Sequence, residues 1–255
     1  MATEYTGTGD PVRSMELLWG VGDTPGTKRG PRPKLRIADV VQKAIALADR
    51  HGLAALSMRR LAEELGVTAM SLYTYVPGKG ELLDLMTDAV CAETARPEPG
   101  DRTWRERLTQ IATENWALYQ RHPWLLQVAT NRPVLGPNLI AKYDYELSAI
   151  DGLGLTDIEM DMTIASLGDF VHGAVRAAVA KTQAEQHTGR TEDEWWAAFA
   201  PLLEKVYDPE RHPTATRVGA AAGEEFQAAT APERTFEFGL ERLLDGVAAL
   251  IESRR

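Results

Sequence analysis

Side chains that can form hydrogen bonds with a polyanion are concentrated in one short stretch, residues 66–76 (GVTAMSLYTYV). The hydroxyl groups of Thr68, Ser71 and Thr74 can both donate and accept, and the small side chains around them allow another molecule to approach closely. The methyl groups of Ala69 and Thr74 suit the methyl group of thymine, while the hydroxyls suit base edges. These side chains therefore suit the binding of another molecule through hydrogen bonds and methyl contacts.

The two tyrosines of this stretch must lie on different sides of a helix. Tyr73 and Tyr75 are two residues apart, and positions i and i+2 point in different directions. We predict that Tyr73 packs inward, with Met70 and Leu72 partly facing the core, and that Tyr75 points outward. The predicted outer face consists of Thr68, Ala69, Ser71, Thr74 and Tyr75.

Positive charge gathers around this stretch, although the chain as a whole is acidic. The 28 basic and 37 acidic residues give a net charge of −9. Between Lys28 and Lys79, however, ten basic residues are opposed by only four acidic ones. A basic block on an acidic body is typical of a protein with a polyanionic partner, although a solvated helix surface has the same composition.

Residues 1–33 are rich in Gly, Pro and Thr and show no lasting periodicity, which predicts a mobile tail. Its last part, KRGPRPK, carries closely spaced charges and prolines that keep it extended. Such an arm suits a DNA minor groove, and it equally suits a plain solubilising tail. The cations of this arm are Lys28, Arg29, Arg32 and Lys34.

Hydrophobic periodicity predicts the helices that position these residues. Apolar residues repeat at i, i+3 and i+4 through residues 37–48. A second helix follows Ser57 and ends at Gly66, and a third runs from about Thr68 to Tyr75. A fourth helix begins at Lys79. Two short helices joined through a glycine are typical of a helix-turn-helix.

A second, larger helical domain is predicted for residues 101–255. The loop RPEPG at residues 96–100 separates it from the helix-turn-helix domain of residues 34–95. No strand pair is predicted, so the expected fold class is all-α. The predicted helices of this domain are 103–121, 124–130, 137–150, 156–187, 192–207 and 235–252.

The run LSMRRLAEELGVTAMSLYTYVPGKGELLDLM resembles the DNA-binding domain of TetR-family transcriptional regulators. The shared pattern is G-V-x-x-x-[ST]-L-Y, an aromatic two residues later, and a Lys that opens the fourth helix. Near the other end, GDFVHGAV and FEFGLERLLDGVAALI resemble two helices of the tetracycline-repressor-type regulatory domain. The resemblance implies a repressor that binds a palindromic double-stranded DNA operator as a homodimer and is released by a small molecule.

The resemblance also implies which residues contact DNA. Lys79 falls on a phosphate contact at the start of the fourth helix, where the helix dipole reinforces its charge. Gly80 departs from the acidic residue that many members place after this Lys. The implied contacts are Ser57, Arg59, Thr68, Ala69, Met70, Ser71, Tyr73, Thr74, Tyr75 and Lys79.

The resemblance implies that apolar stripes on two helices of the larger domain form a homodimer interface. Packing within one chain would produce the same stripes. The predicted interface residues are Val171, Val175, Val179, Leu240, Leu243, Leu244 and Val247.

Aromatic residues of the larger domain predict an apolar pocket for a small lipophilic effector. The same side chains would also suit an ordinary core. The predicted pocket residues are Trp116, Tyr119, Trp124, Tyr143, Phe170 and His172.

The sequence contains no pattern that predicts catalysis, a cofactor or a metal. Cys91 has no basic neighbour, and no Gly-rich phosphate loop or nucleophile elbow occurs. No apolar run approaches the roughly 18 residues that span a bilayer, and no secretory signal begins the sequence, so we expect a cytoplasmic protein without a membrane partner. The alternatives are a helical protein-interaction adaptor and a transcriptional activator with no small-molecule effector.

Overall fold

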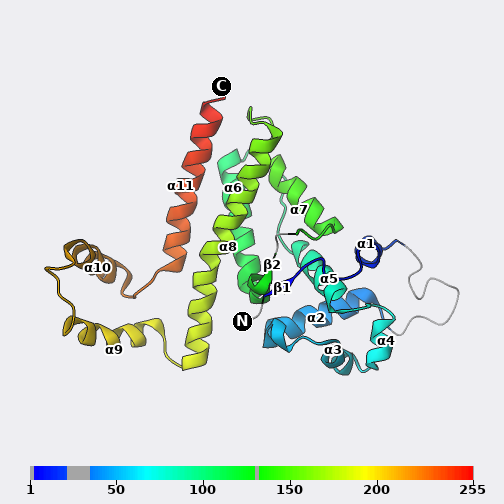
Figure 1. Cartoon of the computed structure of the whole chain (residues 1–255). Helices are drawn as coiled ribbons and strands as arrows, with labels where there is room; N and C mark the ends of the chain where they lie inside the picture. Colours follow the sequence, from blue (N-terminus) through cyan, green and yellow to red (C-terminus); the bar gives the residue numbers. More distant parts are fainter. Residues whose placement is uncertain (1–2, 22–34, 130–131, 255) are drawn as a thin grey trace. The chain divides into compact units, whose positions relative to one another are not determined.

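A computed structural model describes residues 3–21, 35–129 and 132–254 of the chain. Within these residues the regular structure is almost entirely helical, and the strands form one short parallel pair (Figure 1). The chain divides into two compact units. The first unit comprises residues 1–168 and 248–255, and the second unit comprises residues 169–247. The all-α fold class predicted from the sequence is confirmed.

The helix-turn-helix forms where the sequence predicts it, because its ends are set by local hydrogen bonds. The Ser57 hydroxyl accepts from the N–H of Arg60 at 3.2 Å, and the Thr68 hydroxyl accepts from the N–H of Ser71 at 3.2 Å. Gly66 ends the first of these helices with a φ of +67°, which favours glycine. The helices of this region are α2 (Ile37–His51), α3 (Met58–Leu65), α4 (Ala69–Tyr73) and α5 (Lys79–Cys91), with the 3-10 turn η1 (Leu53–Ala55).

Beyond α5, the helices agree with the predicted ones to within about a turn, except at two places. The described part of the predicted helix 124–130 forms a 3-10 turn and a strand, because Val128 and Ala129 pair with the N-terminal segment. Residues 213–226 form a helix that the sequence did not predict, since their Ala- and Gly-rich run lacks a continuous apolar stripe. These elements are α6 (Trp104–Arg121), η2 (Pro123–Gln127), β2 (Val128–Ala129), α7 (Pro137–Ser148), α8 (Asp157–Thr188), α9 (Glu192–Glu204), α10 (Pro213–Phe226) and α11 (Pro232–Glu252).

One hydrophobic core joins the helix-turn-helix to the region that follows the loop 96–100. Val40 and Leu72, both fully buried, belong to the same cluster as Trp124. The division between the two compact units falls between residues 168 and 169. A displacement of side chains in this core would also displace the helix-turn-helix, because close-packed interiors transmit strain.

His122 links the end of α6 to α2 and to the residues after α5. Its Nδ1 lies 2.8 Å from a carboxylate oxygen of Asp49, and its Nε2 lies 3.0 Å from Glu93. The Trp124 indole N–H donates to the same Asp49 oxygen at 2.8 Å. Burial raises the pKa of Glu93, but hydrogen bonds from His122 and Arg121 outweigh burial and hold that pKa below its usual value. His122 is thus a structural residue that is satisfied on both ring nitrogens.

The N-terminal residues fold onto the first unit, so the predicted mobile tail is wrong for residues 3–21. The strand β1 (Glu4–Tyr5) pairs in parallel with β2, and the helix α1 (Pro11–Trp19) follows it. Asp10 caps α1 by accepting from the N–H of Arg13 at 2.9 Å. Leu17 and Leu18 pack against the core. We call residues 3–10 the N-terminal strap.

In the second unit, α8 and α11 meet at an aromatic contact. Phe170 stacks on Phe236 with ring centroids 5.8 Å apart. A Cβ atom at Gly239 would lie 2.6 Å from Cε2 of Phe170, so only glycine allows this close approach. The two aromatic rings thus pack within the chain at this point.

Candidate functional site

Helix α4 presents a short exposed face next to α3. Thr68, Met70, Tyr73 and Thr74 are exposed, with Met70 retaining 78% of its accessible surface. Of the other predicted contacts, Ser57 is exposed, while Ser71 and Ala69 are half-buried, and Arg59 on α3 is exposed and pairs with Glu63 at 3.1 Å. This face is small, polar at its start and open to solvent, as a groove-binding helix requires.

The predicted orientations of the two tyrosines, with Tyr73 inward and Tyr75 outward, are wrong. Tyr73 is 45% exposed, whereas Tyr75 is half-buried and packs against the hydrophobic core. Ala69, Leu72 and Val76 lie on one side of α4 and its continuation, which turns Tyr73 outward. Met70 likewise faces solvent and not the core. The outward aromatic of this stretch is therefore Tyr73.

Lys79 occupies the first residue of α5 and already has an anionic partner. Its ammonium lies 2.6 Å from a carboxylate oxygen of Glu4 on the N-terminal strap, and a third of its side-chain surface remains exposed. The position that the sequence assigned to a phosphate contact is thus paired with an acid of the same chain. Sequence analysis did not predict this pair.

Other cations of the basic block are also paired. Lys43 and Arg50 approach the Glu64 carboxylate at 3.1 Å and 3.7 Å. The hydrogen bond from Lys43 is the main cause that holds the pKa of Glu64 below its usual value. The cations of the predicted minor-groove arm, Lys28, Arg29, Arg32 and Lys34, lie outside the described residues.

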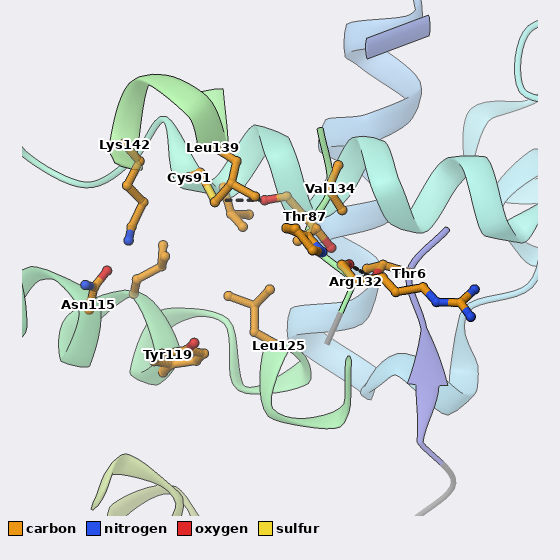
Figure 2. A pocket seen from close by; sticks show the side chains of 13 residues that line it. Thr6, Thr87, Cys91, Asn115, Tyr119, Leu125, Arg132, Val134, Leu139 and Lys142 are labelled. Carbon is orange, nitrogen blue, oxygen red and sulfur yellow. Dashed lines mark hydrogen bonds between the residues drawn. The ribbon is translucent and has the colours of Figure 1, made fainter. Parts of the chain in front are cut away.

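A largely apolar cavity of about 270 Å³ lies beside α5 in the first unit (Figure 2). Its walls come from α5, α6, η2, α7, the N-terminal strap and residues 132–134. Val90, Leu118, Leu125 and Leu139 supply much of the apolar lining. The cavity approaches the lower end of the size range that small-molecule sites occupy, roughly 300 Å³.

Few polar groups reach this cavity. The Thr87 hydroxyl is buried there and has no hydrogen-bond partner among the described residues. Lys142 lines the opposite side, where it pairs with Glu146, and Glu146 also accepts from the Asn115 amide at 3.0 Å. Burial raises the pKa of the Cys91 thiol to about 11, so this thiol acts as part of the apolar wall.

Comparison with known proteins decides the family. The family described as "Bacterial regulatory proteins, tetR family" matches residues 40–86, and "Tetracyclin repressor-like, C-terminal domain" matches residues 96–251. The HTH-type transcriptional repressor DrrR1 of Streptomyces coeruleorubidus is 45% identical over all of this chain and 92% of its own length. The chain belongs to the TetR family. It is therefore a helix-turn-helix DNA-binding regulator of transcription.

Solved structures of TetR-family proteins share the fold. Apo ActR from Streptomyces coelicolor is 27% identical, with a TM-score of 0.70 over 88% of this chain and 99% of that chain. ActR in complex with actinorhodin is 28% identical, with a TM-score of 0.70 over 85% of this chain and 98% of that chain. TetR-family relatives thus include a protein with a small molecule bound.

Most of the aromatic residues predicted to form the effector pocket do not line the cavity beside α5. Tyr119 lines the cavity. Trp116 and Trp124 are buried in the packing of the first unit, and the hydroxyl of the partly exposed Tyr143 donates to Asp161 at 2.6 Å. The other two predicted residues, Phe170 and His172, belong to the second unit. Of the six predicted pocket residues, Tyr119 is thus the one that lines this cavity, and the pocket role of the others stays a prediction.

The predicted dimer-interface residues all lie in the second unit, on α8 and α11. All of them except the half-buried Leu243 are already buried by the chain itself: Val171, Val175, Val179, Leu240, Leu244 and Val247. The buried side chains therefore pack within the chain, and their role in the dimer interface stays a prediction. On α11, Phe238 is a large exposed apolar residue, at 64%, with the Arg242 guanidinium 5.1 Å from its ring centroid.

Three residues of the site escaped the sequence analysis. Thr87 and Lys142 line the cavity, and Glu4 pairs with Lys79. The one feature of the sequence that could have indicated the N-terminal strap is the glycine at position 80. This residue departs from the acidic residue that many TetR-family members have, and a Cβ there would lie 2.7 Å from the Thr8 hydroxyl and 2.8 Å from the N atom of Gly9.

Proposed function

We propose that the chain is a cytoplasmic repressor that binds a palindromic operator as a homodimer. In this proposal α4 lies in the major groove and Lys79 contacts a phosphate. A small lipophilic molecule, bound in the cavity beside α5, releases the repressor. The observation that carries the proposal is Thr87, which lines this cavity on the helix that begins with Lys79 and whose buried hydroxyl has no hydrogen-bond partner among the described residues.

The exposed face of α4 supports the DNA-binding part. Thr68, Met70 and Thr74 lie toward solvent on a helix whose buried side is held by Leu72. Hydroxyl and methyl groups suit base edges and thymine methyls in the major groove. The exposed hydroxyl of Tyr73 suits a phosphate oxygen at the rim of the groove.

The cavity lining supports a particular class of effector. Its walls are mostly aliphatic, which favours a flat or compact apolar molecule. The Thr87 hydroxyl lacks a hydrogen-bond partner among the described residues. The Lys142 ammonium and the Asn115 amide are hydrogen-bond donors on the other side of the cavity. We therefore propose a lipophilic ring compound with carbonyl or hydroxyl oxygens on two of its edges.

Helix α5 supplies the route from the effector to the DNA. Thr87 follows Lys79 by eight residues, or about 12 Å along a helix that rises 1.5 Å per residue. The Asp88 carboxylate also accepts from the N–H groups of Asn138 and Leu139 at the start of α7, at 3.1 Å and 2.9 Å. A molecule wedged between α5 and α7 would displace both helices, and with them the phosphate contact.

The test is a thermal-shift screen of small aromatic compounds that carry carbonyl or hydroxyl groups, followed by operator release in a fluorescence-anisotropy assay. Leu139→Trp fills the cavity from α7 and should abolish both the shift and the release. Ile140→Trp is the matched control, because Ile140 is exposed one position along the same helix and does not line the cavity. Compounds that act equally on wild type and Leu139→Trp would place the effector site elsewhere.

A further inference from the structure

We infer that the N-terminal strap is an internal competitor for the DNA backbone. Its Glu4 carboxylate occupies the Lys79 ammonium that an operator phosphate needs, so the strap must give up this contact when the protein binds DNA tightly. This inference rests on the proposed role of Lys79 as a phosphate donor. It adds a regulatory segment that lies outside the helix-turn-helix.

The contact is chemically equivalent to the one that it would replace. A carboxylate oxygen of Glu4 lies 2.6 Å from the Lys79 ammonium, which is the distance of a charge-assisted hydrogen bond. A phosphate oxygen would require the same donor, and both anions gain from the positive end of α5. Because the two sites overlap at one ammonium group, DNA and Glu4 compete.

The strap crosses the start of α5 so closely that a glycine is needed at position 80. A Cβ at Gly80 would lie 2.7 Å from the Thr8 hydroxyl, and a Cβ at Gly9 would overlap the Glu81 carboxylate. Gly80 has no positive φ, so backbone conformation does not demand glycine there. The close approach of the strap does, which explains why this chain lacks an acidic residue at position 80.

Three further hydrogen bonds fasten the strap and α1 to α5. The N–H of Gly7 donates to the Asp84 carboxylate at 2.9 Å, and the N–H of Asp10 donates to Glu81 at 2.8 Å. The Ser14 hydroxyl donates to the second oxygen of Asp84 at 3.1 Å. The carboxylates on the first two turns of α5 thus hold the strap in the position where Glu4 reaches Lys79.

The other side of the strap belongs to the wall of the cavity. The Thr6 hydroxyl lies 3.2 Å from the carbonyl oxygen of Ala129 and 2.6 Å from that of Arg132, and Thr6 lines the cavity. The strap therefore touches both the proposed phosphate contact and the proposed effector site. A molecule in the cavity that holds Thr6 and Arg132 in place would also keep Glu4 on Lys79.

The test measures the affinity of the full-length protein for an operator duplex that wild type selects from a random library. Glu4→Gln removes the competing charge and should tighten binding by about two- to five-fold, the range of one exposed ion pair. The slope of log K against log salt should stay nearly the same as for wild type, since Lys79 neutralises the same phosphate in both complexes. Glu16→Gln is the matched control, because Glu16 carries the same charge on α1 and pairs with Arg13 instead. It should leave affinity unchanged.

Lys79→Ala separates failure of this inference from failure of the proposed function. If Lys79→Ala weakens binding but Glu4→Gln leaves it unchanged or weakens it, the strap does not compete with DNA, although the phosphate contact stands. If Lys79→Ala binds as well as wild type, the phosphate contact itself is wrong. Equal tightening by Glu4→Gln and Glu16→Gln would reveal a general charge effect and overturn the inference.

Gly80→Ala provides a second test that leaves both charged groups in place. The added methyl collides with Thr8 and Gly9, so it should push the strap away from α5 and tighten DNA binding to the same extent as Glu4→Gln. The double variant Gly80→Ala with Glu4→Gln should bind no more tightly than either single one. Additive effects would contradict a shared cause.

Discussion

Replacing Thr87 by Val gives a sharp test of the cavity, because the hydroxyl has no partner to lose. Thr87 is 7% exposed, and its Oγ1 makes no hydrogen bond among the described residues. Valine has nearly the same shape, with a methyl group in place of the hydroxyl. The substitution therefore removes a buried polar group without creating a cavity.

The expected change in the free energy of unfolding follows from this environment. A buried polar group without a partner costs about 1–3 kcal/mol. Thr87 lines a cavity and is not packed in a dry core, so the lower end applies, and Thr87→Val should stabilise the ligand-free protein by about 1 kcal/mol. For a chain of this size that raises Tm by about 2–4 °C.

Thr94→Val is the control in a thermal unfolding assay at fixed protein concentration. Thr94 is also buried, but its hydroxyl donates to the carbonyl oxygen of Cys91 at 3.1 Å. Losing this bond should destabilise the protein by about 1 kcal/mol. With an effector from the compound screen, Thr87→Val should show a smaller increase in Tm than wild type. If Thr87→Val lowers the ligand-free Tm as Thr94→Val does, the Thr87 hydroxyl has a partner and is not an effector contact.

Three further predictions follow from the burial of particular side chains. Tyr75→Ala should lower the free energy of unfolding by about 2 kcal/mol, somewhat less than the loss of a fully buried aromatic side chain would. Tyr73→Ala should keep the wild-type free energy of unfolding and lose operator affinity in anisotropy titrations. The reverse pattern would restore the orientations first predicted. Met70→Ala should keep its Tm and change the preferred bases in operator selection, and an unchanged preference would remove Met70 from the groove. Burial lowers the pKa of His172 below its usual 6.5, so the unfolded state binds more protons below that pH. Calorimetry at about pH 7.5 and about pH 5.5 should therefore show a smaller fall in Tm for His172→Gln than for wild type, and equal falls would refute a contribution from this ionisation.

Local chemistry made the helix-turn-helix predictable from the sequence. Ser57 and Thr68 accept from N–H groups three residues ahead, and Gly66 provides a left-handed end, so each signal acts within a single turn. The faces of Tyr73 and Tyr75 were not predictable in this way. Helix α4 ends at Tyr73, and the packing of Tyr75 beyond it depends on the core of the whole unit.

Long-range contacts account for the features that the sequence did not predict. The strap pairs Glu4 and Tyr5 with Val128 and Ala129, more than a hundred residues away, and nothing in its Gly- and Thr-rich composition indicates that partner. A cavity is likewise the space that packed side chains leave open, so aromatic content alone did not locate it. Trp124, for example, fills the core and donates to Asp49.

The most direct test of the central claim compares two duplexes in fluorescence-anisotropy titrations of the full-length protein. One duplex is the palindrome that the protein selects from a random library, and the other has the same base composition in scrambled order. The account predicts binding to the palindrome that is tighter by about a thousandfold or more, with both affinities falling as salt increases. Equal affinity for the two duplexes at every salt concentration would contradict a sequence-reading role for α4.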